Sequence, residues 1–206
     1  KAGSIGPPTQ YLGASVGKWK FENGDQCWYM GSDQYVAEAI RNVSSWLEGR
    51  GQALKSKVAA VLPSNYRPEL DVSPLCNAED HSTYMQHIGI LRWAVELGRI
   101  DIATEVSMMA AYAAAPRQYH LMALMHIYAW LKSHNRSKVV LDPSYVKHAE
   151  PDKLDWEQFY PGASELLPPD MPEPLGKPIQ MTTFVDSDHA GDKVTRRSRT
   201  GVLIFL

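Results

Sequence analysis

Three aspartates stand close together near the end of the chain, with a spacing that suits a hard metal ion. Asp186 ends an apolar run, Asp188 comes two residues later, and Asp192 comes four residues after Asp188. A carboxylate at the end of a β-strand, with a second one close by, can coordinate Mg²⁺ through oxygen. The alternative is an ordinary polar turn that leaves a strand. An EF-hand loop does not fit, because its twelfth position requires Glu and is Arg197 here.

A cluster of basic residues follows these aspartates directly. It consists of Lys193, Arg196, Arg197 and Arg199. Arginine binds phosphate with two parallel hydrogen bonds, so the cluster could contact a nucleic-acid backbone. The alternative is a solvated hairpin loop. With 21 basic and 23 acidic residues the chain has a formal charge of −2, so nucleic-acid binding would depend on such a local patch.

The N-terminal segment 8–30 is rich in aromatic residues and is predicted to be β structure. Tyr11–Val16 is predicted as one strand. Asn23-Gly24 separates two aromatic-rich runs and predicts a hairpin, because both residues tolerate positive φ. Its aromatic side chains, beside Lys18 and Lys20, could stack on bases. The alternative is a hairpin that buries one aromatic face.

Apolar residues at helical spacing predict four helices between positions 32 and 135. Each helix carries an apolar stripe that needs a partner, so we expect a small helical bundle. The starts of these helices are predicted at Ser32, Asp80, Asp101 and Pro116. A short strand is predicted at Val139–Leu141.

The segment 142–180 differs in composition from the rest of the chain. It holds eight of the 14 prolines and has a net charge of −5, which is typical of a linker or an extended surface segment. Beyond it, Met181–Asp186 and Thr200–Leu206 are predicted as two strands. No run of apolar residues is long enough for a membrane span. With two cysteines and no sign of secretion, we expect a protein of a reducing, intracellular compartment.

Five short segments follow one another along the chain in a recognisable order. They are Tyr11-Leu12-Gly13; Gln34-Tyr35-Val36; Tyr84, Gly89 and Leu91 with Asp101-Ile102-Ala103; Pro116, His120 and Tyr128 with Trp130-Leu131-Lys132; and Asp186–Asp192 with Arg196-Arg197-Ser198 and Gly201. In this order they resemble the Pol polyprotein of copia-type LTR retrotransposons. The chain departs from that family's pattern at Ile100, where Pro is usual, at His189, where Trp is usual, and at Arg199, where a small polar residue is usual.

The resemblance implies an α+β fragment of a reverse transcriptase joined to a ribonuclease H. Residues 1–31 would end the palm, 32–141 would form a helical thumb and connection, 142–180 would be an acidic Pro-rich linker, and 181–206 would begin the ribonuclease H-like sheet. The parent would perform RNA-directed DNA synthesis with Mg²⁺ and cleave the RNA strand of hybrids. It would be intracellular and not secreted: cytoplasmic, in a virus-like particle, and/or nuclear.

The same resemblance assigns roles to individual residues. Tyr11, Leu12 and Gly13 would help to hold the primer end. Asp186 would be the first catalytic, metal-binding carboxylate of the nuclease. From their charge and position, Arg196 and Arg197 are assigned to the hybrid backbone.

The family's Tyr-x-Asp-Asp motif does not occur in these 206 residues. Two-metal phosphoryl chemistry needs several carboxylates around two ions, and Asp186 alone cannot supply them. Both ends of the chain look cut, so we expect an inactive fragment that binds primer–template duplex and the rest of the polyprotein. Two alternatives stay open: a non-enzymatic helical interaction module and a decayed element.

Overall fold

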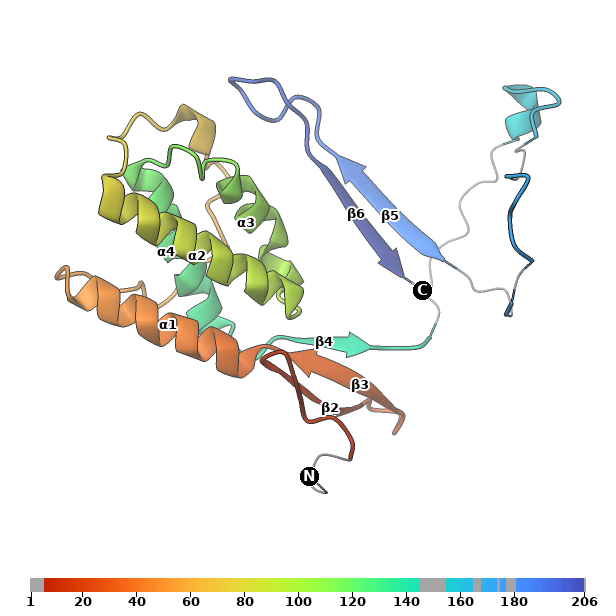
Figure 1. The fold of residues 1–206 in the computed structure, drawn as a ribbon, viewed down its shortest axis with the longest axis horizontal. Helices are drawn as coiled ribbons and strands as arrows, with labels where there is room; N and C mark the ends of the chain where they lie inside the picture. The colour runs from red at the N-terminus through yellow and green to blue at the C-terminus, as the bar shows by residue number, and fades with distance from the viewer. Residues whose placement is uncertain (1–5, 145–154, 165–167, 174, 177–180, 206) are drawn as a thin grey trace. The chain divides into compact units, whose positions relative to one another are not determined.

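The computed structural model describes residues 6–144, 155–164, 168–173, 175–176 and 181–205. It is a mixed α+β structure that divides into two compact units (Figure 1). The first contains residues 1–143 and the loop Asp188–Arg199, and the second contains 144–187 and Thr200–Leu206. The first unit holds a small antiparallel sheet and four α-helices, as the α+β prediction requires.

The sheet of the first unit has four antiparallel strands in chain order. The last strand follows the four helices in the sequence and pairs with the third strand. Gly24 has a φ of +92° in the turn that joins the second and third strands, which confirms the predicted Asn-Gly hairpin. The predicted strand at Val139–Leu141 is also confirmed, and it pairs with the third strand. The strands are β1 Gln10–Tyr11, β2 Ala14–Lys20, β3 Gln26–Gly31 and β4 Lys138–Leu141.

The prediction of one strand over Tyr11–Val16 is wrong. The chain reverses at Leu12 and Gly13, whose φ angles are +49° and +93°, and Tyr11 pairs with Ala14 across the turn. Two successive residues at positive φ are typical of the type I′ turn that joins twisted strands. The sequence signal was obscured because Leu12 is not a residue that normally adopts this conformation.

Four α-helices form where the apolar stripes predict them. They share a single core of fully buried side chains, among them Val43, Tyr84, Leu91, Leu124 and Ile127. The helices are α1 Asp33–Glu48, α2 Ala78–Glu96, α3 Ala103–Ala110 and α4 Gln118–Ser133. Short 3-10 turns at η2 Pro68–Leu70 and η3 Ile100–Ile102 precede α2 and α3.

Two of the predicted helix caps are wrong. Helix α2 begins two residues before Asp80, and the Asn77 side chain accepts a hydrogen bond of 2.8 Å from the Asp80 backbone N–H. Asp101 lies inside η3 rather than at the start of α3, because its carboxylate is held by Arg99.

The prediction that Pro116 lies in the first turn of α4 is wrong. Its carbonyl accepts a hydrogen bond from Cys76 N–H, and Arg117 forms an extended bridge with Leu75. These contacts keep the segment extended, so α4 begins only at Gln118.

The strands β5 Thr182–Ser187 and β6 Thr200–Phe205 pair as an antiparallel hairpin, as predicted, with Asp186 opposite Gly201. In the proposed linker 142–180 the structure describes a short 3-10 turn, η4 Trp156–Gln158. Residues 145–154, 165–167, 174 and 177–180 of that linker lie outside the described residues. Among the helices that the structure describes, none has the length and apolar character of a membrane span.

Candidate nucleic-acid interface

The tip of the β1–β2 hairpin exposes two large side chains. Tyr11 and Leu12 have 62 % and 60 % of their surface exposed. Leu12 holds a left-handed backbone conformation, which costs a residue with a Cβ roughly 1–2 kcal/mol. A Cβ on Gly13 would lie 3.9 Å from Leu97 Cδ1, so the turn rests against the end of α2. An apolar side chain that is both strained and exposed is a candidate contact residue.

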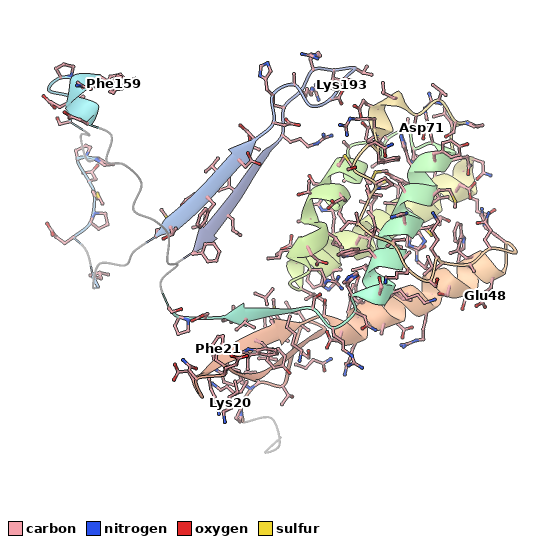
Figure 2. All side chains as sticks on the ribbon, turned by 180° about the vertical axis from the view of Figure 1, so that it is seen from behind. Lys20, Phe21, Glu48, Asp71, Phe159 and Lys193 are labelled. Atoms are coloured by element: carbon pink, nitrogen blue, oxygen red, sulfur yellow. The ribbon has the colours of Figure 1, made fainter. Side chains whose placement is uncertain are left out.

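Each face of the sheet carries an ammonium group over an aromatic ring. The Lys18 ammonium lies 3.7 Å from the Trp28 ring centroid, and the Lys138 ammonium lies 4.1 Å from that of Tyr29. Tyr29 can lie flat because Gly17 stands opposite, and a Cβ there would come within 2.8 Å of the ring. Figure 2 shows side chains projecting from both faces of this sheet, near the labelled Lys20 and Phe21. Paired cations and aromatic rings are the groups that bind nucleic-acid strands without sequence preference.

Sequence reasoning missed Lys138 and Arg136 as members of this surface. They follow Trp28 and Tyr29 by more than 100 positions, and β3–β4 pairing alone places Lys138 opposite Gly31. The only signal in the sequence was the short apolar run at Val139–Leu141, which predicted a strand but not its partner.

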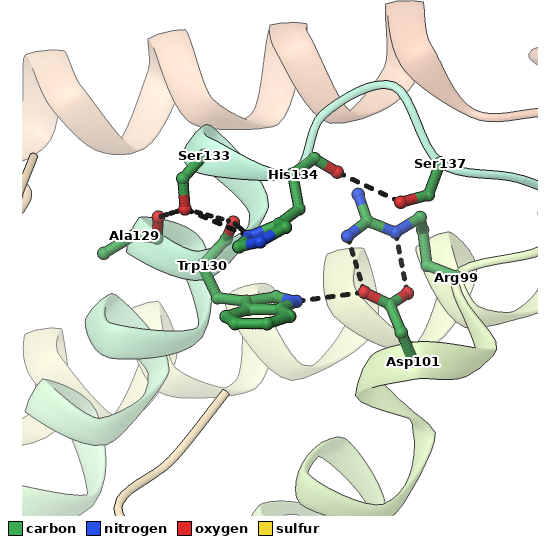
Figure 3. Close-up of polar contacts among 7 residues, drawn as sticks. All are labelled: Arg99, Asp101, Ala129, Trp130, Ser133, His134 and Ser137. Carbon is green, nitrogen blue, oxygen red and sulfur yellow. Dashed lines mark hydrogen bonds and ion pairs between the residues drawn. The ribbon is translucent and has the colours of Figure 1, made fainter. Parts of the chain in front are cut away.

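A partly buried ion pair lies close to the place where the chain leaves α4 for β4 (Figure 3). The Arg99 side chain is only 1 % exposed and donates two hydrogen bonds to the Asp101 carboxylate. Trp130 N–H donates a third, and the His134 ring stacks on the Trp130 indole at 3.7 Å. Because β4 begins four residues after His134, this network positions the strand that carries Lys138.

Two of the three aspartates in the predicted cluster accept hydrogen bonds from the backbone of their own loop. Asp188 accepts a hydrogen bond from the Arg199 backbone N–H, and Asp192 accepts from the N–H groups of Thr195 and Val194. These backbone hydrogen bonds, that of Thr195 first, hold the pKa of Asp192 below its ordinary value. Asp188 and Asp192 therefore shape the loop.

Asp186 is exposed on β5 and shares one face of the hairpin with Phe184 and Leu203. Within the described part of the chain no three carboxylate, imidazole or thiol groups gather in a way that could hold a metal ion. Among the described residues, Asp186 is the one carboxylate of the predicted cluster that accepts no backbone hydrogen bond, and a single carboxylate does not make a two-metal site.

Arg196 and Arg197 lie at the exposed tip of the loop between β5 and β6. The Arg197 carbonyl accepts a hydrogen bond of 3.2 Å from Asp192 N–H, and Arg196 has a φ of +59°. Neither guanidinium forms an ion pair with a described residue. Both guanidinium groups are therefore available to contact phosphate.

No protein-family model matches this chain, and searches of curated proteins and of solved structures find no match either.

Proposed function

We propose that this chain is part of a copia-type retrotransposon polymerase, and that its role is to bind primer–template duplex. Residues 1–31 would end the palm, 32–141 would form the thumb and connection, and β5 with β6 would begin a ribonuclease H-like sheet. The parent polyprotein would carry out RNA-directed DNA synthesis and cleavage of the RNA strand.

The exposed, strained Leu12 is the observation that carries this proposal. A bulky residue at positive φ in a two-residue turn costs stability, and a contact of its exposed side chain with a bound partner would offset that cost. It lies in the Tyr11-Leu12-Gly13 segment, where the resemblance puts the contact with the primer end. The sheet that follows presents cations and aromatic rings, which suit a phosphate backbone.

The β5–β6 hairpin supports the second half of the proposal. An isolated two-stranded hairpin is marginally stable in water, and this one exposes between 41 % and 64 % of Phe184, Val185, Val202, Leu203, Ile204 and Phe205. Apolar residues on both faces are suited to a larger sheet in which Asp186 would be the first carboxylate. Mg²⁺ chemistry would belong to such a completed site, and we assign no catalytic step to the residues described here.

Binding to an RNA–DNA hybrid tests this proposal. Fluorescence anisotropy with a labelled 20-base-pair hybrid would compare the chain with an R196A/R197A variant. Removing two phosphate contacts should weaken binding and lower the slope of log affinity against log salt by about 2. The control is K57A, which removes an exposed lysine in the loop between α1 and α2. This variant should leave both the affinity and the salt slope unchanged. A chain that binds no hybrid at low salt would overturn the proposal.

A further inference from the structure

A hollow of about 460 Å³ opens where the sheet meets the start of α1. Its lining comes from three separate parts of the first unit: β2, the first residue of α1, and β4 with the turn before it. The lining residues are Trp19, Asp33, Arg136, Lys138 and Val140. Sites for small ligands usually measure about 300–1,000 Å³, so the hollow has room for one nucleotide.

Strand register explains why these side chains meet. Directly paired residues lie on one face of a sheet, and every second residue along a strand returns to that face. Trp19 pairs with Cys27, and Tyr29 pairs with Val140. Trp19 therefore shares one face with Lys138 and Val140, although these two residues follow it by 119 and 121 positions.

The hollow is lined by an aromatic ring, two cationic side chains and one carboxylate that can accept a hydrogen bond. Trp19 has 41 % of its surface exposed. Arg136 and Lys138 have no ion-pair partner among the described residues, and Lys138 lies over the Tyr29 ring. One oxygen of Asp33 is buried and accepts no hydrogen bond from any described group. The α1 N-cap residue, Ser32, also makes no side-chain capping bond.

We propose that this hollow binds one nucleotide of a single-stranded nucleic acid. Its base would stack on Trp19, its phosphate would contact Arg136 and Lys138, and Asp33 would accept a hydrogen bond from the nucleotide. The inference rests on the proposed function and adds a specific subsite for an unpaired strand. An acidic peptide would use the two cations but would have no base to stack on the indole.

Binding of a labelled octauridylate to the whole chain tests the proposal. W19A should weaken binding about tenfold, since stacking on an aromatic ring contributes roughly 1–3 kcal/mol per base. W19F should retain most of the affinity. R136A/K138A should lower the salt slope by about 1.4, because single strands release about 0.7 counterion per contact. The controls are Y119A, at an exposed position of α4, and K57A, at an exposed loop position. Both variants should bind as the parent chain does.

Circular dichroism melts of each variant show whether it is folded, and W19F keeps the test valid if W19A is not. Unchanged octauridylate binding by folded W19A and R136A/K138A would overturn the proposal, as would equal competition by polyglutamate. If octauridylate binding is unchanged in W19A and R136A/K138A while these variants and the parent chain bind the RNA–DNA hybrid with equal affinity, the proposed function stands and only the subsite fails. If the parent chain binds octauridylate but no hybrid, the proposed function fails instead.

Discussion

Arg99 and Asp101 form a two-point ion pair at the junction between the helices and the sheet. Arg99 Nε lies 2.8 Å from Asp101 Oδ1, and Arg99 Nη2 lies 2.7 Å from Oδ2. Burial alone raises the pKa of Asp101, but hydrogen bonds from Arg99 and Trp130 outweigh it and hold the pKa below its ordinary value. Under the proposed function, the pair would belong to the family's Arg-Pro-Asp-Ile-Ala block, with Ile100 in place of Pro.

Replacing Asp101 with Asn should destabilise the chain by about 3 kcal/mol. The Arg99 guanidinium would stay buried without a countercharge, and breaking one side of such a pair costs roughly 3–5 kcal/mol when both groups are buried. Asp101 is one-third exposed, so we expect the lower end of that range. Urea unfolding would measure the effect. E96Q, an exposed carboxylate at the end of α2, should change stability by less than about 0.5 kcal/mol, and an equally mild D101N would contradict the account.

His87 should make the stability of the chain fall in acid. Burial lowers the pKa of this histidine to about 4, where its ring contacts Tyr128 and Trp46. The unfolded chain, with an ordinary pKa near 6.5, then binds more protons between pH 6.5 and 4, so the free energy of unfolding decreases as the pH falls through that window. The loss attributable to this group should reach about 3 kcal/mol.

Comparison with H87Q isolates this contribution, because other groups titrate equally in both chains. The parent should lose more stability than H87Q between pH 7 and pH 4, as followed by urea unfolding. Parallel pH profiles would show that His87 is protonated as easily in the folded chain as in the unfolded one.

Gly98, just beyond the end of α2, and Gly89, inside that helix, should respond oppositely to alanine. Gly98 has a φ of +103°, and a Cβ there would lie 2.9 Å from Val139 Cγ2. G98A should therefore cost about 2 kcal/mol or more, from the backbone conformation and from displacement of β4. Gly89 is exposed within α2 with open space around it, so G89A should stabilise by about 1 kcal/mol. Thermal unfolding of both variants would show the signs, and a neutral G98A would mean that β4 does not pack there.

Replacing Leu12 with Asn should separate stability from binding. Asn tolerates positive φ, and Asn-Gly is favoured in a type I′ turn, so L12N should stabilise the chain by about 1 kcal/mol. If Leu12 contacts the primer end, the same change should weaken hybrid binding several-fold. Thermal melts and anisotropy on one preparation would measure both. A variant that gains stability and keeps full affinity would leave the strain at Leu12 without a functional reason.

Periodicity predicted the four helices well because each has a clear apolar stripe that the bundle buries. It failed where tertiary contacts override local preference. Asp101 has the right residue type for a cap, but Arg99 holds it elsewhere. Leu12 turns the chain although its side chain disfavours the conformation.

The candidate site could be predicted only where its residues are close in the sequence. Asp186, Asp188 and Asp192 lie together in the chain, but the loop uses two of the three carboxylates for its own backbone. Trp19 and Arg136 line one hollow from opposite ends of the unit's sequence, and no local pattern connects them.

The salt dependence of hybrid binding tests the central claim most directly. The dissociation constant for a 20-base-pair RNA–DNA hybrid should rise at least about tenfold between 50 and 200 mM salt, as expected for two or more phosphate contacts. The same dissociation constant at both salt concentrations, or no binding at 50 mM, would contradict the account.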